Sequence, residues 1–261
     1  MPGPEPGGGV PLEGQVIVIT GAAQGLGAGI ARYLHAAGAR LLLLDRDADR
    51  LAEIVSACPG AVSAVVDLAD ASATERALAE VVTEPVDTLI HNAAILRMEP
   101  LEDVTLAAFQ ATLNVGIQAG FQLVKALWPA MKTRGGALVF VSSRSGIEGF
   151  ADETAYCATK HALEGFSKSL ALEGEPYGIL SVTVTPGMYM HTPMSETNYP
   201  PELREKWVDP IELAPAFAFL ATRPLHLSGQ RLDAWALSRP DAAPRPDAAR
   251  RTESPPTEPA P

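Results

Sequence analysis

Hydrophobic and polar positions along the chain form two alternating kinds of segment. Short runs such as 16–19 and 41–44 are apolar at every position, which is typical of strands buried on both faces of a parallel sheet. Longer segments between them repeat apolar residues with the period of an α-helix. We expect strands at 15–20, 40–44, 61–66, 87–91, 137–141, 179–185 and roughly 229–235, and helices at 26–39, 48–57, 71–82, 106–132, 153–175 and 210–222.

The alternation of strands and helices predicts repeated βαβ units, and therefore an α/β protein with a parallel sheet. No change in composition interrupts the pattern, so we expect one domain over residues 12–237. Residues 1–11 contain four prolines and four glycines, and residues 238–261 contain seven prolines. Neither end has the apolar residues for a core, so both are predicted to be disordered tails.

Composition narrows the classes of function. The 261 residues are 47% hydrophobic and carry a net charge of −11, which argues against nucleic acid or an anionic membrane surface as a partner. The longest apolar runs have the length of strands, so no transmembrane helix is expected. The two cysteines, Cys58 and Cys157, lack metal-ligand spacing and fit a reducing compartment. The N-terminus has no signal-peptide pattern, so we expect a cytoplasmic protein.

A glycine-rich turn follows the first predicted strand and leads directly into a helix. Its glycines are Gly21, Gly25 and Gly27, with Gln24 and Leu26 between them. Glycines in this position permit a tight turn and let backbone N–H groups approach a pyrophosphate at the helix N-terminus. The pattern predicts a dinucleotide-binding turn, and a turn that binds nothing is the alternative.

Asp45 ends the second predicted strand, eighteen residues after Gly27. A carboxylate here would accept hydrogen bonds from an adenosine ribose and would repel a 2′-phosphate. Gln24 places no cation in the turn to receive that phosphate. These residues predict NAD as the cofactor in preference to NADP. Arg46 leaves an alternative open. It is either a charge exposed to solvent or a residue that reaches the region of the 2′-phosphate of NADP.

Tyr156 and Lys160 are four residues apart in a predicted helix, so their side chains leave the same face. The charge of an adjacent ammonium favours the phenolate, and would lower the pKa of the tyrosine toward values suited to proton transfer. The spacing alone is weak evidence, because a half-buried tyrosine packed on a lysine stem has the same pattern.

Seven motifs in the chain occur in a fixed order. They are Thr20-Gly-x-x-x-Gly-x-Gly27, Asp67-Leu68, Asn92-Ala93-Ala94, Asn114, Ser142-Ser143, Tyr156-x-x-x-Lys160 and Pro186-Gly187. In this order they resemble the short-chain dehydrogenase/reductase superfamily, in its single-domain branch of ~250 residues, over about residues 12–237. The resemblance implies a Rossmann-type, doubly wound parallel sheet of seven strands in a three-layer αβα sandwich, with the ligand cleft beyond the carboxyl ends of the strands.

The resemblance also implies roles for individual residues. Tyr156 would exchange a proton with the substrate oxygen, Ser143 would hydrogen-bond that oxygen, and Lys160 would bind the nicotinamide ribose. Asn114 would hold a water that links Lys160 to solvent. Ser143 is chosen over Ser142 because it lies thirteen residues before Tyr156 and because neighbouring strand residues point to opposite faces. Residues expected to contact the cofactor are Gly21, Gln24, Gly25, Leu26, Gly27, Asp45, Arg46, Asp67, Leu68, Asn92, Ala93, Ala94, Tyr156, Lys160, Pro186 and Gly187.

Two features depart from the pattern of the superfamily, and the substrate side is predicted from one further segment. His91 stands where the superfamily usually has an asparagine, and we interpret it as a strand-end residue rather than a catalyst. The spacing to Thr192 is one residue longer than usual, which leaves open whether this threonine binds the carboxamide. The segment 188–207 is predicted to form a short lid over the substrate.

We therefore expect an enzyme that transfers a hydride between NAD and a secondary alcohol or its ketone. Two alternatives are an NADP-dependent ketoreductase, for example of 3-oxoacyl thioesters, and a dinucleotide-binding protein without turnover. We expect a small-molecule substrate and no metal. The long predicted helices that carry Asn114 and Tyr156 have apolar residues beyond one core face, so we also expect a homodimer or homotetramer.

Overall fold

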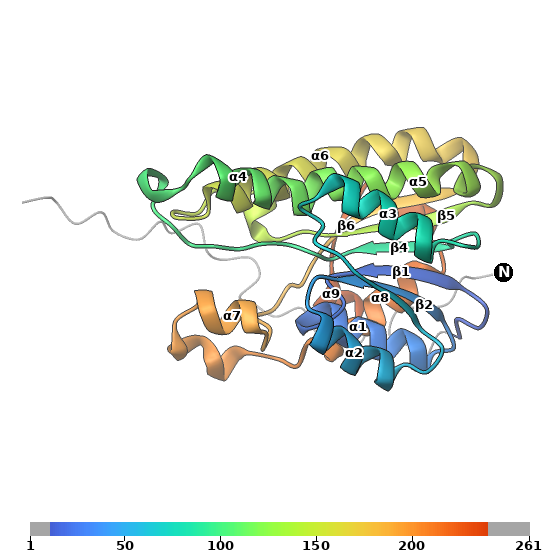
Figure 1. The fold of residues 1–261 in the computed structure, drawn as a ribbon, viewed down its shortest axis with the longest axis horizontal. Coiled ribbons are helices and arrows are strands. Elements are labelled where there is room, and N and C mark those ends of the chain that lie inside the picture. Colours follow the sequence, from blue (N-terminus) through green and yellow to red (C-terminus); the bar gives the residue numbers. More distant parts are fainter. Residues whose placement is uncertain (1–10, 240–261) are drawn as a thin grey trace, which may run out of the picture.

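Seven parallel strands form one sheet through the centre of the molecule (Figure 1). The computed structural model describes residues 11–239. The strands lie in the order β3-β2-β1-β4-β5-β6-β7, and every neighbouring pair is parallel. They are β1 (Val16–Thr20), β2 (Arg40–Asp45), β3 (Val62–Val65), β4 (Thr88–His91), β5 (Gly136–Val141), β6 (Ile179–Thr185) and β7 (Arg231–Asp233). The predicted α/β fold with a doubly wound, seven-stranded sheet is confirmed.

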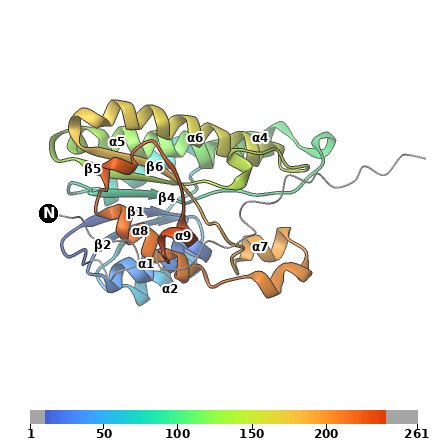
Figure 2. The same ribbon diagram turned by 180° about the vertical axis from the view of Figure 1, so that it is seen from behind.

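Helices cover both faces of this sheet (Figures 1 and 2). One face carries α3 (Ala71–Val81), α4 (Leu106–Leu113), α5 (Ala119–Arg134) and α6 (Thr154–Gly174). The other carries α1 (Gly25–Ala36), α2 (Ala48–Ala57), α8 (Ala214–Ala221) and α9 (Ala234–Leu237). A further short helix, α7 (Pro193–Asn198), stands away from both layers.

Alternate residues of each central strand enter two separate cores. Ile17 and Ile19 of β1 pack into the core beneath α1 and α8, whereas Val16 and Val18 pack into the core beneath α5 and α6. Successive side chains of a strand point to opposite faces, so a strand covered on both sides must be apolar at every position. The continuous apolar runs of the sequence are a direct consequence of this burial.

The strand order reverses between β1 and β4, which pair side by side with Thr20 opposite His91. The chain runs outward from β1 through β2 to β3, and then returns to the other side of β1. A reversal of this kind opens a crevice beyond the carboxyl ends of the two central strands, where dinucleotides and substrates bind in open α/β sheets. The glycine turn follows β1 and the segment 92–100 follows β4, so both leave the sheet at this crevice.

Three predicted elements differ from those observed. The helix expected over 210–222 begins as a 3₁₀-helix, Pro210–Leu213, and only then continues as α8. The helix expected over 106–132 is divided into α4 and α5 by a π-helical turn at Asn114–Gln118, which we call the π-turn. The strand expected over 229–235 is shortened to Arg231–Asp233, because the Asp233 side chain accepts a hydrogen bond from the backbone N–H of Ala236 and caps α9.

The segment 188–207 contains α7 and a 3₁₀-helix, Pro201–Lys206. Figure 1 shows α7 and the start of α4 projecting beyond the body of the sheet, on its opposite sides. Thr192 caps α7 by accepting a hydrogen bond from the backbone N–H of Ser195 at 3.1 Å. The segment is therefore placed where a lid over the crevice would lie.

Most of the two predicted tails lies outside the described residues. Ser238, which the sequence assigns to the C-terminal tail, binds the body of the protein: its hydroxyl donates to the carbonyl of Leu213 and accepts from the N–H of Ala216, each at 3.1 Å. Among residues 11–239, no helix combines the length and the apolar character that crossing a membrane requires.

The packing of the glycine turn predicts a large difference between two glycine substitutions in helices. A Cβ atom on Gly27 would lie 2.0 Å from the carbonyl oxygen of Gly21, whereas a Cβ on Gly165, which is exposed on α6, would meet no atom within 4 Å. Gly27→Ala should lower the free energy of unfolding by about 1–3 kcal/mol or more. Gly165→Ala should raise it by up to about 1 kcal/mol, because alanine is the better helix former. Urea unfolding measures both, and equal stabilities would contradict this packing.

Candidate active site

The glycine turn is fastened to the start of the segment after β4. The side-chain amide of Asn92 donates hydrogen bonds to the carbonyls of Thr20 and Gly21, at 3.1 and 3.0 Å. The Thr20 hydroxyl accepts from the backbone N–H groups of Asn92 and Ala93, both at 3.1 Å. Gly21 and Gly25 have φ angles of +65° and +55°, which favour glycine. These contacts shape a turn whose N–H groups can bind a pyrophosphate.

Asp45 lies against the same turn at the end of β2. One carboxylate oxygen accepts from the backbone N–H of Ala23 at 2.9 Å, and the other accepts from the N–H of Asp47 at 3.0 Å. Each oxygen keeps a second lone pair for a ribose hydroxyl. The Asp45 carboxylate therefore lies beside the glycine turn, at the end of the site that would bind adenosine.

Arg50 is a residue of this region that the sequence interpretation missed. Its guanidinium donates to the side-chain oxygen of Gln24 and lies 3.5 Å from the carboxylate of Asp47. Arg46 is exposed nearby in sequence. Position 50 falls in the first turn of the predicted helix 48–57, so its proximity to the glycine turn could have been anticipated from the βαβ arrangement.

Ser143, Tyr156 and Lys160 come together at the carboxyl end of β5. Ser143 follows the strand, and its side chain forms a hydrogen bond with that of Tyr156 near the start of α6. Lys160 lies one turn further along, with its Nζ 5.2 Å from the centroid of the Tyr156 ring. That Nζ also donates to the carbonyl of Val141 at 2.7 Å. The predicted helical geometry of the Tyr–Lys pair is thus present.

Burial controls the titration of this pair. Removal from water is the main cause that raises the pKa of Tyr156 above its ordinary value, and the hydrogen bond with Ser143 only partly offsets it. Burial also lowers the pKa of Lys160 to about 8, against the opposing effect of the Glu164 carboxylate. The expected low pKa of Tyr156 is therefore not observed: burial keeps this pKa above its ordinary value, and the phenol is protonated at neutral pH.

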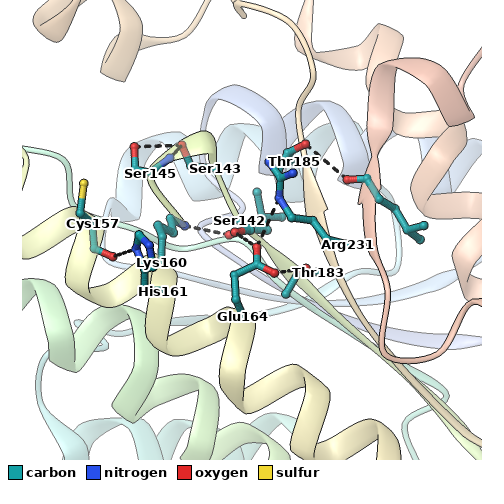
Figure 3. Close-up of polar contacts among 12 residues, drawn as sticks. Ser142, Ser143, Ser145, Cys157, Lys160, His161, Glu164, Thr183, Thr185 and Arg231 are labelled. Atoms are coloured by element: carbon teal, nitrogen blue, oxygen red, sulfur yellow. Dashed lines mark hydrogen bonds and ion pairs between the residues drawn. The ribbon is translucent and has the colours of Figure 1, made fainter. Parts of the chain in front are cut away.

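Glu164 fastens α6 to three strands and was not anticipated from the sequence (Figure 3). Its carboxylate accepts from the hydroxyls of Ser142 at 2.5 Å and Thr183 at 2.8 Å, and lies 3.6 Å from Nε of Arg231. These partners belong to the end of β5, to β6 and to β7. Ser142 is therefore occupied with Glu164, which leaves Ser143 to face Tyr156.

Asn114 begins the π-turn, and its side-chain amide donates to the carbonyl of Ala69 at 3.2 Å. Just before Ala69, Leu68 is buried and the Asp67 carboxylate accepts from the Ala69 N–H at 2.9 Å. Asn114 thus joins the segment after β3 to the helix layer. A water relay from Asn114 to Lys160 stays a prediction.

The segment that follows β6 passes beside the end of β7 before it reaches α7. Gly187 has a φ of +74°, and a Cβ there would lie 2.1 Å from a carboxylate oxygen of Asp233. The carbonyl of Pro186 accepts from the backbone N–H of Trp235 at 3.2 Å. Further along, the methyl group of Thr192 lies 3.1 Å from the Cβ position of Gly25. The base of the lid therefore contacts the glycine turn rather than standing free of it.

A small depression lies beside Tyr156. Its lining includes Ile95, Arg97, Glu99, Thr112 and Asp152 together with Tyr156. Val104, Ala108, Thr154 and Ala155 complete the lining, so charged and apolar side chains both face the depression. Within residues 11–239, no cluster of His, Cys, Asp and Glu could hold a metal ion.

His91 is a buried link between the central strands and the π-turn. Because the Thr20 hydroxyl accepts two backbone N–H groups, its own hydrogen is directed at Nδ1 of His91, 2.9 Å away. Nε2 then carries the hydrogen and donates to the carbonyl of Gly116 at 2.7 Å. Burial lowers the pKa of His91 to about 4, so the ring is neutral. The interpretation of His91 as a strand-end residue agrees with this placement, but its contact with the π-turn was missed.

The glycine turn, the Ser143–Tyr156–Lys160 group and the strand order occur together in one known family. The family model for short chain dehydrogenases matches residues 15–202. The chain belongs to the short-chain dehydrogenase family.

Relatives within this family are reductases. L-xylulose reductase from Mus musculus is 39% identical over 190 residues, covering 72% of this chain and 77% of the mouse enzyme. Carbonyl reductase [NADPH] 2 from Sus scrofa is 35% identical over 191 residues, covering 72% of this chain and 78% of the pig enzyme.

Solved structures of short-chain dehydrogenases share the fold. A Beutenbergia cavernae protein assigned as an NAD(P)-dependent gluconate 5-dehydrogenase, with bound NADP, superposes with a TM-score of 0.79 at 29% identity, covering 87% of this chain and 99% of that one. Carveol dehydrogenase from Mycobacterium avium, in complex with NAD, gives a TM-score of 0.78 at 25% identity with the same coverage.

The buried, neutral His91 predicts a specific loss of stability in acid. Its pKa is about 4 in the folded protein against 6.5 ordinarily, so unfolding takes up a proton between these two values. The free energy of unfolding should therefore fall as the pH falls through this window, by roughly 3 kcal/mol at ~1.36 per unit. His91→Gln keeps a donor for the carbonyl of Gly116 and cannot titrate, so the variant should not show this fall in the free energy of unfolding. Urea unfolding of both proteins from about pH 7 to pH 4 measures the difference, and parallel curves would refute it.

Proposed function

We propose that this protein is an NAD-dependent oxidoreductase that interconverts a ketone and a secondary alcohol on a small polyhydroxylated substrate. The observation that carries the proposal is the convergence of Ser143, Tyr156 and Lys160 beside the glycine turn, at the carboxyl ends of the central strands. A proton-transfer group, a hydrogen-bond donor and a cation at this crevice are what hydride transfer to or from a carbonyl carbon requires.

The chain fits a dinucleotide because the turn between β1 and α1 admits only glycine at its tightest points and is closed on one side by Thr192. A bound nicotinamide cofactor would supply or accept the hydride. Tyr156 would donate a proton to the substrate oxygen in reduction and remove it in oxidation. Ser143 would hydrogen-bond the same oxygen. Lys160 would hold the ribose and, by its charge, limit the cost of a phenolate in this buried place.

Asp45 and Gln24 support NAD over NADP. The Asp45 carboxylate is positioned against the turn by two backbone N–H groups, and a 2′-phosphate beside it would meet a fixed negative charge. The competing proposal, an NADP-dependent ketoreductase, is favoured by Arg46 and by Arg50, whose guanidinium reaches Gln24. It is also favoured by one relative named as an NADPH reductase and by neighbours with bound NADP. Asp45 binds the backbone of the turn, whereas Arg50 binds the side chain of Gln24, so we favour NAD.

The substrate class is inferred from two sources. Relatives named L-xylulose reductase and D-erythrulose reductase act on ketoses by their names, and three charged side chains, Arg97, Glu99 and Asp152, line the depression beside Tyr156. A short ketose or the corresponding polyol meets both conditions. A dinucleotide-binding protein without turnover is disfavoured because the proton-transfer group is complete.

Self-association is proposed through the helices on the α5 and α6 side. Leu106, Phe121 and Leu172 are 70%, 50% and 75% exposed on α4, α5 and α6. Exposed apolar side chains of this size on neighbouring helices support the expected dimer or tetramer. The cytoplasmic location also stays a prediction.

Removal of one phenol hydroxyl should separate catalysis from cofactor binding. Tyr156→Phe should lower the rate of reduction of L-xylulose or erythrulose by at least about 10²-fold, because the proton donor is lost. NADH binding, followed by fluorescence, should change little. Tyr177→Phe removes the same atom from a residue just beyond the opposite end of α6 and should leave both unchanged. A Tyr156→Phe protein with wild-type turnover would overturn the mechanism.

Cofactor preference should depend on Asp45. Asp45→Ala should lower the ratio of kcat/KM for NAD to that for NADP by about tenfold or more, since a hydrogen bond to a charged group contributes ~1.5–3 kcal/mol. The ratio is internal to each protein, so a general loss of folded enzyme cancels. A wild-type enzyme that already prefers NADP would refute the NAD proposal and favour the ketoreductase alternative.

A further inference from the structure

A buried carboxylate lies directly before the helix that carries Tyr156. Glu153 is only 5% exposed and occupies the N-cap position of α6, three residues before the tyrosine. Its Oε2 accepts a hydrogen bond from the hydroxyl of Ser145 at 2.7 Å. The N-terminus of a helix favours a negative charge, so this position suits a carboxylate. None of the roles assigned above involves Glu153 or Ser145.

The hydrogen bonds from Ser143 to Glu153 have a defined direction. An ionised carboxylate can only accept, so the Ser145 hydroxyl must donate to Glu153. Ser145 Oγ then accepts from the hydroxyl of Ser143 at 3.2 Å, and Figure 3 shows these two serines facing each other. The Ser145 N–H donates back to Ser143 Oγ at 3.2 Å. A Ser143 hydrogen directed at Ser145 is not available to stabilise a Tyr156 phenolate, and the hydroxyl hydrogens of both serines point toward Glu153.

We propose that Glu153 is a positioning residue that, through Ser145 and Ser143, holds Tyr156 in its proton-donating form and so adapts the site to carbonyl reduction near neutral pH. In that reaction the hydride from NADH forms the new C–H bond, the Tyr156 O–H bond breaks, and its proton forms the alcohol O–H. Solvent then returns a proton to Tyr156. The inference rests on the proposed oxidoreductase function and concerns the pH range of each direction, not the equilibrium between substrate and product.

The charges around Tyr156 support the assignment to Glu153. After burial, the groups that raise the pKa of the phenol are Tyr199 from the lid, then Glu153 and Cys157 from α6 and its cap. Lys160 lies on the same helix, with its Nζ held by the carbonyl of Val141. The pKa of Tyr199 is itself raised by burial, so this phenol carries no charge at neutral pH. Glu153 is therefore the group whose full negative charge opposes a phenolate under ordinary conditions.

The test compares pH profiles of kcat/KM in both directions for wild type and Glu153→Gln. Glutamine keeps an oxygen that can accept from Ser145 but removes the charge. Reduction is followed with NADH and whichever of L-xylulose or erythrulose the wild type reduces faster, and oxidation with NAD and the matching polyol. We expect the alkaline limb of the kcat/KM profile for reduction to move to lower pH by about one unit, and the acidic limb of the profile for oxidation to move by the same amount. Oxidation on the acidic limb should then rise by up to about tenfold.

Two further variants keep the result interpretable. Ser145→Ala breaks the hydrogen-bond chain between Ser143 and Glu153 and frees the Ser143 hydrogen to stabilise a phenolate. It should therefore shift both limbs of the pH profiles in the same direction. This variant tests the inference even if Glu153→Gln fails to fold. Glu173→Gln removes an equal charge from an exposed site on the same helix and should leave the profiles in place. Unshifted profiles for folded Glu153→Gln or Ser145→Ala would overturn the inference.

Failure of the inference can be told apart from failure of the proposed function. If the wild type is active, Tyr156→Phe is inactive and Glu153→Gln has the wild-type profile, only the role of Glu153 is wrong. If the wild type reduces neither ketose, or Tyr156→Phe retains activity, the proposed function itself is wrong and the inference falls with it.

Discussion

The anchoring of α6 by Glu164 is the interaction on which the site depends. One buried carboxylate binds a hydroxyl from the end of β5, a hydroxyl from β6 and the guanidinium of Arg231 on β7. Loss of any partner would leave charge or hydrogen-bonding capacity unsatisfied in a place shielded from water, which is costly. The helix therefore has one favourable position along the sheet, and this position fixes where Tyr156 and Lys160 lie.

The same helix places a second buried carboxylate on the other side of the Tyr–Lys pair. Glu164 lies one turn beyond Lys160 and supports its positive charge, whereas Glu153 lies one turn before Tyr156 and opposes a negative one. Both effects are strong because burial removes the screening by water. The electrostatics of the site are thus those of a protonated phenol beside a lysine whose pKa burial has lowered, a state prepared for giving a proton to a substrate oxygen.

Local sequence patterns predicted most of the helices and strands, and the elements that were predicted incorrectly have physical causes. The helix over 48–57 was predicted at its observed bounds, because its apolar period and its Asp47 cap are both local. The π-turn was not visible, because a change from one helical hydrogen-bond pattern to another leaves the apolar period nearly unchanged. The last strand ended early because the Asp233 side chain bonds the backbone N–H of Ala236 and starts α9 there.

By itself, the sequence determined the family, the parallel sheet and the residues that meet at its carboxyl edge. Strands buried on both faces must be apolar throughout, and motifs such as the glycine turn and the Tyr–Lys spacing are local. Only the tertiary structure decided what surrounds those residues. Glu153, Glu164 and His91 act on Tyr156, Lys160 and the π-turn through burial and through partners distant in the chain, such as Thr183 and Thr20, which no spacing along the sequence reveals.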